Sequence, residues 1–325
     1  MRLHPLIGVV FAAVVVFLSS SAVEAQSWPD RPVRLIVPFP PGGSTDVVGR
    51  MIGDQLRQRL GQPIVVENRS GAGGTIGSDS AAKAAPDGYT LVIGTSSTHA
   101  IAPAVFSSLP YDPNADFQPV TLIGSATVML VTHPSVPARS VSELVALARA
   151  KPDALTFASS GSGGVSHLIG EYFKSRAGVS MLHVPYKGDT PMITDLIGGQ
   201  VSLAFGTAVA FLPHVQKGSL RALAVTNATP SPIAPGLPTI AESGLPGFEA
   251  LQWFGILVPA STPKPIVDRL HREIAAVLEL PDTRERLQAL GIEVSGGSPQ
   301  AFAAFMKSEA LKWQKVAQDA NVKVN

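Results

Sequence analysis

Arg34-Leu-Ile-Val-Pro-Phe-Pro-Pro-Gly-Gly-Ser-Thr-Asp46 is the stretch of sequence that decides the fold. The apolar run at its start, Val33–Val37, predicts a buried strand, which the following prolines end. Gly42 and Gly43 let the backbone turn tightly and approach a ligand closely. The serine or threonine after them can cap a predicted helix over residues 46–60. Because free N–H groups at a helix N-terminus attract anions, this stretch predicts an anion site on a strand–turn–helix unit.

The same strand–turn–helix pattern occurs a second time. Leu155-Thr-Phe-Ala-Ser-Ser-Gly-Ser-Gly-Gly164 joins a predicted strand to a predicted helix over residues 167–177. Short apolar runs alternate with helical patterns along the chain, which predicts parallel sheets covered by helices on both faces. Ligands of open α/β sheets bind beyond the carboxyl ends of strands. We therefore expect two α/β lobes, each directing a helix N-terminus at one cleft.

The remaining elements follow from apolar periodicity and from the glycines and prolines that bound it. Predicted strands lie at 33–39, 64–68, 90–94, 120–123, 128–132, 155–158, 182–185, 202–205, 222–226 and 254–258. Predicted helices lie at 46–60, 167–177, 191–197, 265–280 and 299–320.

Residues 1–25 have the features of a secretory signal peptide. Arg2 provides a positive start, Leu6–Leu18 is apolar, and Val23-Glu-Ala25 offers small residues for cleavage. The apolar part is shorter than the roughly 20 residues that span a membrane. We predict cleavage after Ala25, which leaves a soluble, monomeric protein in the periplasm.

The composition excludes several kinds of chemistry. The chain has no cysteine, so disulfides, thiolate catalysis and zinc–thiolate sites are absent. Its 25 Lys and Arg nearly balance its 24 Asp and Glu, and no basic stripe suggests nucleic acid as a partner. The seven histidines are scattered without metal-ligand spacing. We expect neither a metal nor a cofactor.

Three further segments follow predicted strands. Thr95-Ser-Ser-Thr-His99 either points hydroxyls into the cleft or caps a helix. Arg69-Ser-Gly-Ala-Gly-Gly-Thr-Ile-Gly77 lacks the G-x-G-x-x-G spacing of a nucleotide site and is interpreted as another turn at the cleft rim. Lys187, in Tyr186-Lys-Gly-Asp189, either pairs with an anion or is a solvated loop charge.

A secreted serine-dependent hydrolase is the enzyme alternative. Ser159, Ser160, Ser162 and Ser166 are candidate nucleophiles, and none of them lies in a G-x-S-x-G motif. The members of a catalytic triad can be far apart in sequence, so the alternative stays open.

Several runs together resemble one family. They are Pro38-Phe-Pro-Pro-Gly-Gly-Ser-Thr-Asp46, Asn68-Arg-Ser-Gly-Ala-Gly-Gly-Thr-Ile-Gly77, Ala85-Pro-Asp-Gly-Tyr-Thr-Leu91, Leu109-Pro-Tyr-Asp-Pro113, Val184-Pro-Tyr-Lys-Gly188, Gly199-Gln-Val201, Leu220-Arg-Ala-Leu-Ala-Val225 and Gly244-Leu-Pro-Gly-Phe248. In this order, over residues 28–325, the chain is similar to the Bug family of extracytoplasmic receptors, which resemble the receptor of tripartite tricarboxylate transporters.

The resemblance implies a two-lobed periplasmic binding protein, of the Venus flytrap type, rather than an enzyme. Each lobe would be a mostly parallel sheet with helices on both faces. Crossover strands near Val120–Ile123 and Phe254–Val258 would divide the chain into lobe 1 (28–123 plus 252–325) and lobe 2 (124–251). The ligand would be a mono-, di- or tricarboxylate or an acidic amino acid, and the partners a membrane permease or sensor subunits.

The resemblance also implies which residues hold the ligand, between the first turn and its counterpart in the second lobe. The predicted ligand-binding residues are Phe39, Gly42, Gly43, Ser44, Thr45, Asp46, Ser96, Thr98, His99, Ser160, Gly161, Ser162, Gly163, Tyr186 and Phe205. One departure is that Gly206-Thr207, and not an acidic residue, follows Phe205. This absence favours a simpler or more apolar acid as ligand.

Overall fold

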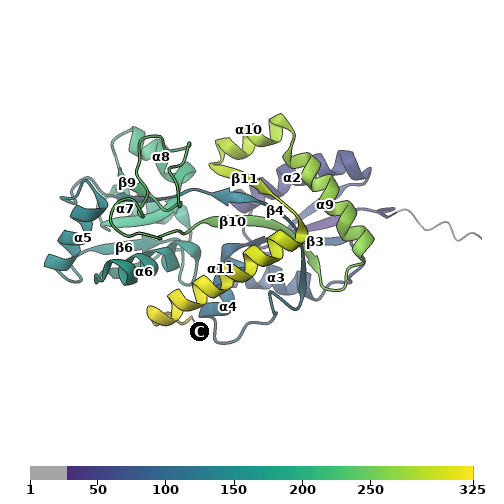
Figure 1. Cartoon of the computed structure of the whole chain (residues 1–325), viewed down its shortest axis with the longest axis horizontal. Coiled ribbons are helices and arrows are strands. Elements are labelled where there is room, and N and C mark those ends of the chain that lie inside the picture. The colour runs from purple at the N-terminus through teal and green to yellow at the C-terminus, as the bar shows by residue number, and fades with distance from the viewer. Residues whose placement is uncertain (1–27, 325) are drawn as a thin grey trace, which may run out of the picture.

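The structure, a computed structural model, describes residues 28–324. The signal peptide predicted at residues 1–25 and its cleavage site lie outside the described residues. The described chain forms two lobes, each built on one sheet, with β4 and β10 running side by side between them (Figure 1). None of the helices within residues 28–324 has both the length and the apolar character needed to cross a membrane.

The first lobe contains a six-stranded sheet with strand order β11-β4-β10-β3-β1-β2. Its strands are β1 (Val33–Val37), β2 (Ile64–Asn68), β3 (Thr90–Thr95), β4 (Phe117–Ala126), β10 (Gln252–Pro259) and β11 (Ile292–Gly296). Its helices are α2 (Ser44–Leu60), α3 (Thr75–Ala82), α4 (Ala102–Val105), α9 (Lys264–Leu278), α10 (Pro281–Ala289) and α11 (Pro299–Asp319). A 3₁₀ turn, η2 (Ala72–Gly74), precedes α3, and a π-helical turn, η3 (Ser97–Ile101), precedes α4.

The second lobe contains a five-stranded sheet with strand order β7-β6-β8-β5-β9. Its strands are β5 (Val128–Thr132), β6 (Thr156–Ser159), β7 (Leu182–Pro185), β8 (Leu203–Thr207) and β9 (Arg221–Val225). Its helices are α5 (Val141–Ala150), α6 (Val165–Ala177), α7 (Asp189–Ile197) and α8 (Ala208–Gln216).

The two sheets follow the same plan. Read from one edge, β2-β1-β3-β10-β4 in the first lobe corresponds to β7-β6-β8-β5-β9 in the second, and β11 is an addition to the first. In each sheet, the strand that arrives from the other lobe is antiparallel to both of its neighbours: β10 lies between β3 and β4, and β5 lies between β8 and β9. Both sheets are therefore mixed: parallel strands make up one part of each sheet, as predicted, and β10 or β5 runs against them.

These strand directions also decide where the turns point. β4 carries the chain into the second lobe. Both β3 and β4 are antiparallel to β10, and β1 is parallel to β3. The strands β1, β3 and β4 therefore run in the same direction. In the second lobe β5 enters from the first lobe and β8 opposes it, with β6 parallel to β8. The carboxyl ends of β1, β3, β6 and β8 therefore lie on the sides of the two sheets that face each other.

The first crossing between the lobes is almost direct. β4 ends at Ala126 and β5 begins at Val128, so that only Thr127, which is fully buried, separates them. The N–H of Thr127 donates to Gly291 O in the first lobe (3.1 Å), and its carbonyl accepts from Ala208 N in the second (2.9 Å). The second crossing leads from β9 through residues 226–251 into β10. We retain the predicted lobe boundaries as a proposal.

Helices cover both faces of both sheets. One core cluster lies under α2, α9 and α10 in the first lobe, and another lies under α7 and α8 in the second. The third cluster contains residues of both lobes together with Phe302 and Trp313 of α11. This long helix extends across the molecule from one lobe to the other (Figure 1). The lobes are thus joined by a shared apolar core as well as by the two crossings.

Candidate functional site

The first glycine turn, residues 42–46, connects β1 to α2. Gly42 has a φ of +83°, which only glycine adopts readily, and Gly43 is the extended N-cap of α2, with φ −77° and ψ 168°. No side chain caps this helix, whose first hydrogen bond runs from Val47 N to Gly43 O (3.0 Å). The N–H groups of the first helical turn therefore lack an acceptor within the helix. Such N–H groups can bind an anion, and the anion site at this turn stays a prediction.

Asp46 fixes the shape of the first glycine turn from inside. Its Oδ2 accepts hydrogen bonds from Gly42 N (2.9 Å) and from Arg50 Nε (3.0 Å). Asn68, at the end of β2, donates through Nδ2 to Asp46 Oδ1 (2.8 Å) and to Phe39 O (3.1 Å). The Asn68 Oδ1 in turn accepts from Arg50 (3.0 Å). Both oxygens of Asp46 are thus used by the turn itself.

The environment keeps Asp46 ionised. Burial alone would raise the pKa of its carboxyl, but hydrogen bonds from Arg50, from the Gly42 amide and from Asn68 lower the pKa below its ordinary value of 3.8. A buried carboxylate whose oxygens are already occupied offers nothing to an anionic ligand. We therefore interpret Asp46 as a support of the site, although the sequence predicted it as a ligand contact.

Replacement of Asn68 by alanine should weaken the first glycine turn. The change removes both donors that hold Phe39 O and Asp46, and it leaves buried acceptors unsatisfied at a cost of about 1–3 kcal/mol in the free energy of unfolding. Thermal unfolding measures that loss, and we expect carboxylate affinity in calorimetry to fall about tenfold. Asn114→Ala, at an exposed loop position, is the matched control. Unchanged affinity in Asn68→Ala would contradict the supporting role.

The second glycine turn, residues 163–167, repeats the first with the same backbone. Gly163 has a φ of +73°, and Gly164 is the extended N-cap of α6, with φ −82° and ψ 173°. This helix also has no side-chain cap, and its first hydrogen bond runs from Leu168 N to Gly164 O (3.1 Å). Gly163 N donates to Nδ1 of His167, four residues on, as Gly42 N donates to Asp46. The two turns are therefore structural counterparts.

This correspondence shifts the predicted site in the second lobe. The sequence predicted contacts from Ser160 to Gly163, but three amides of that segment already have acceptors within the lobe. Ser160 N donates to Ser166 Oγ (3.0 Å), Gly161 N to Ser159 Oγ (3.4 Å) and Gly163 N to His167. The donors without a partner in the helix are those of the first turn of α6, together with the exposed Ser162.

A stacked pair of histidines lies directly under the second glycine turn. The rings of His167 and His183 are 3.8 Å apart and nearly parallel, and Phe157 stacks on His183 at 4.8 Å. His183 Nε2 lies 2.7 Å from Ser159 Oγ, whose hydroxyl has Gly161 O as acceptor at 3.1 Å. Burial is the main cause that lowers the pKa of His167 to about 3 and that of His183 to about 4. Both rings are neutral at neutral pH.

The residues predicted after β3 are buried beneath the site. Thr98 is fully buried, and its Oγ1 contacts Thr95 N (3.1 Å) and His99 Nδ1 (2.8 Å). His99 packs edge-on against Phe117 at 4.7 Å, and burial lowers its pKa to about 3. Ser96 Oγ and His99 Nε2 are buried without a hydrogen-bond partner among the described residues. Thr98 and His99 are thus buried side by side, and their contact with a ligand stays a prediction.

Two other predicted contacts have structural roles. Phe205 in β8 is fully buried against Phe173 of α6 at 5.6 Å, so it exposes no surface to a ligand, because β8 is an interior strand. The hydroxyl of Tyr186 donates to Asp195 (2.8 Å), and burial followed by that carboxylate raises its pKa to about 12. Tyr186 N also donates to Ser159 O (2.9 Å), which anchors the segment after β7.

Close contacts show how the turns are assembled. A Cβ added to Gly74 would lie 2.6 Å from the Thr98 side chain and 3.1 Å from the Phe39 ring, so the turns after β1, β2 and β3 touch. A Cβ on Gly163 would lie 2.9 Å from Val324 and 3.5 Å from Val105. The second glycine turn therefore packs against the first lobe.

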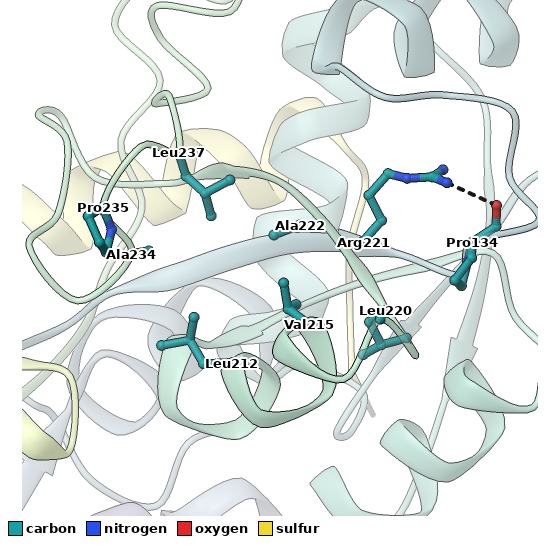
Figure 2. Close-up of a pocket in the computed structure, with 10 residues that line it drawn as sticks. Pro134, Leu212, Val215, Leu220, Arg221, Ala222, Ala234, Pro235 and Leu237 are labelled. Carbon is teal, nitrogen blue, oxygen red and sulfur yellow. Dashed lines mark hydrogen bonds between the residues drawn. The ribbon is translucent and has the colours of Figure 1, made fainter.

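One cavity of the described structure lies away from both glycine turns. Figure 2 shows this cavity of about 490 Å³ in the second lobe, between Leu212 and Val215 of α8 and Leu237. Arg221 lies at one end, where its guanidinium donates to Pro134 O (3.3 Å) and to two further backbone carbonyls. None of the predicted site residues lines this cavity.

Sequence reasoning missed the residues that brace the turns from neighbouring strands. Asn68 and His183 reach the turns only because β2 pairs with β1 and β7 pairs with β6. The i,i+4 spacing of Asp46 and Arg50 was a signal that could have identified that pair. Within residues 28–324, no group of three or more His, Asp or Glu side chains is placed to hold a metal ion.

Comparisons with known proteins are consistent with one another. A family profile described as "Tripartite tricarboxylate transporter family receptor" matches residues 48–322. BugT of Bordetella pertussis is 38% identical over 324 residues, covering 99% of this chain and 98% of BugT. A solved R. palustris protein with adipate has a TM-score of 0.83 and 40% identity, covering 91% of this chain and 99% of that one. MatC from Rhodopseudomonas palustris with bound malate has a TM-score of 0.80 and 36% identity, covering 89% and 99%.

Proposed function

Because the chain belongs to the tripartite tricarboxylate transporter receptor family, we propose that it captures a small carboxylate between its two lobes. The observation that carries the proposal is the pair of glycine turns. One turn lies in each lobe, their backbones match, and each leaves the N–H groups of an uncapped helix without an acceptor in the helix. We propose that the protein is a periplasmic receptor and that residues 1–25 are the signal peptide that directs its export.

The chemistry of the turns suits a carboxylate. An anion that leaves water needs several hydrogen-bond donors in return. Backbone N–H groups at a helix N-terminus provide them, and each helix end contributes roughly 0.3–2 kcal/mol through its dipole. Arg50, a cation of α2 next to the first turn, is already bound to Asp46 and Asn68. The proposed grip therefore depends on neutral donors.

The solved relatives support the size and charge of the ligand. The R. palustris protein was solved with adipate and MatC with malate, which are both short dicarboxylates. Since Gly206 and Thr207 follow Phe205 here, no acidic side chain at that point selects an amino group. We propose a short organic acid without an amino group as the ligand.

Closure of the lobes would turn binding into a signal. If each lobe provides part of the donors, the ligand binds the closed form more tightly and shifts the population toward it. A membrane permease or a sensor subunit that recognises the closed form would then respond to the ligand. We propose such a partner, and both kinds are consistent with the site.

A panel of mono-, di- and tricarboxylates, including adipate and malate, tests the proposal by thermal shift. At a ligand concentration of about 100 times Kd, we expect about 2.7 kcal/mol of stabilisation, or a rise of about 5 °C or more in the unfolding midpoint. Choline, a cation without a carboxyl group, is the control ligand. If no carboxylate raises the midpoint, the proposed function is wrong.

The hydrolase alternative has little support in the geometry. Of the four candidate serines, the one that contacts a histidine is Ser159, which is fully buried and has a carbonyl acceptor for its proton. The charged side chain that perturbs His183 is the cation Lys174, and a triad needs a carboxylate there. Ester turnover that disappears in Ser162→Ala would support the alternative.

A further inference from the structure

We propose that His167 is the positioning residue of the second glycine turn, and that it takes the place that Asp46 has in the first. The inference rests on the proposed function, because the role of His167 is to hold the second glycine turn so that the N–H groups of the first turn of α6 can bind an anion. His167 does not itself contact the ligand. It holds the Gly163 amide, and it does so without adding a negative charge to the site.

The equivalence is exact in position within the helices. Asp46 and His167 are both the third residue after the N-cap glycine, Gly43 or Gly164. Each side chain accepts the N–H of the glycine just before that cap, at 2.9 Å for Gly42 to Asp46 and at 3.0 Å for Gly163 to His167. Each bond holds a backbone with positive φ. Two different side chains therefore make the same contact.

The contact determines the tautomer of His167. Because the Gly163 N–H is the donor, Nδ1 must be unprotonated, and the proton of the neutral ring is on Nε2. Nε2 lies 3.9 Å from Glu171 Oε1, and that carboxylate is held by Lys174 Nζ at 2.9 Å. A proton on Nδ1 would place two donors face to face and break the turn.

Burial and the cation of Lys174 favour the neutral ring of His167, and Glu171, the carboxylate that faces its Nε2, is paired with that same lysine. His183 from β7 lies flat against it, and Phe157 from β6 lies beyond. Lys174 and Glu171 on its own helix compensate each other. From the first lobe, the residues nearest Gly163 are the apolar Val105 and Val324. Burial, then His183 and Lys174, lower the pKa of His167 to about 3, so the acceptor persists through the neutral range.

Charge explains why a histidine suits this position. A carboxylate at the third residue of a helix cancels part of the positive field at the N-terminus, and in the first lobe Arg50 offsets that effect. A neutral imidazole accepts the same hydrogen bond and leaves the field of α6 intact. The N-terminus of α6 therefore attracts an anion more strongly than the N-terminus of α2 does.

Two variants of the full mature chain test the inference. His167→Asn keeps an acceptor of similar reach that does not titrate, and His167→Ala removes the acceptor. Amide hydrogen exchange of Gly163, followed by NMR, reports the turn directly, and calorimetry with adipate and malate reports binding. His214→Ala, in α8 of the same lobe, is the matched control because its side chain lies outside both turns.

We expect His167→Ala to expose the Gly163 amide to fast exchange and to weaken binding about tenfold. We expect His167→Asn and His214→Ala to resemble the wild type in both measurements. Wild-type affinity should also be constant between about pH 5.5 and 7.5, where an ordinary histidine would titrate. Wild-type behaviour of His167→Ala, or equal damage from His167→Asn, would overturn the inference. If the wild type binds no carboxylate, the proposed function fails, and Gly163 exchange alone then decides the role of His167.

Discussion

Gly43→Asp should abolish carboxylate binding and leave the protein at least as stable as the wild type. Gly43 has an ordinary φ of −77°, and a Cβ there would have Pro40 O at 3.7 Å as its nearest contact, so the new side chain fits without strain. Aspartate is among the best N-cap residues, because its oxygen accepts from the second or third N–H of the helix. The variant would thus hold its own carboxylate where the ligand should be.

The Gly43→Asp variant is expected to gain stability and to lose affinity for carboxylates. A carboxylate at the N-terminus of α2 should stabilise the helix by up to about 1 kcal/mol. Calorimetry with adipate and malate should show affinity reduced by at least about 100-fold, which is about 2.7 kcal/mol. Gly43→Asn, a neutral cap of the same size, separates occupation of the donors from charge repulsion, and Gly43→Ala should retain most binding. Wild-type affinity in Gly43→Asp would remove the first glycine turn from the site.

Trp313→Ala should cost about 3–5 kcal/mol in the free energy of unfolding. Trp313 of α11 is fully buried in the core cluster that contains residues of both lobes, and its ring lies edge-on to Tyr172 of α6 at 6.4 Å. Its Nε1 also donates to Glu309 (3.2 Å). Truncation leaves a cavity at the place where the helix joins the lobes, and urea unfolding measures the loss.

Leu311→Ala is the matched control on the same helix. Leu311 is 60% exposed, so its truncation should change the free energy of unfolding by less than about 0.5 kcal/mol. Comparable losses in the two variants would mean that α11 is not anchored through Trp313.

Much of the framework can be predicted from the sequence because each strand is short, apolar and bounded by turn residues. The strands predicted at 64–68, 128–132 and 182–185 coincide with β2, β5 and β7. β11 was missed because Ile292–Gly296 combines one buried residue with glutamate, serine and glycine. It is a strand only because Ile292–Val294 pair with β4. Strand direction was also invisible, since a local pattern is the same in both orientations.

In the candidate site too, local features could be predicted from the sequence and contacts between distant segments could not. The glycine turns are local, and their glycines and helix starts could be identified along the chain. The braces are not local: Asn68 lies beside the first turn because it pairs with Val37, and His183 lies beside Ser159 because it pairs with Phe157. Pairing register between distant strands leaves no mark in a short window of sequence. The burial of Phe205 was invisible for the related reason that an interior strand buries both of its faces.

The bonds of Thr127 have a mechanical consequence. Its N–H belongs to the peptide plane shared with Ala126, and its carbonyl belongs to the plane shared with Val128. One plane is fastened to Gly291 and the other to Ala208, which lie on opposite sides of the crossing. Between them only two torsions, φ and ψ of one buried, β-branched residue, are left to rotate. At this crossing, these two torsions are therefore the ones that a rotation of one lobe against the other would change first.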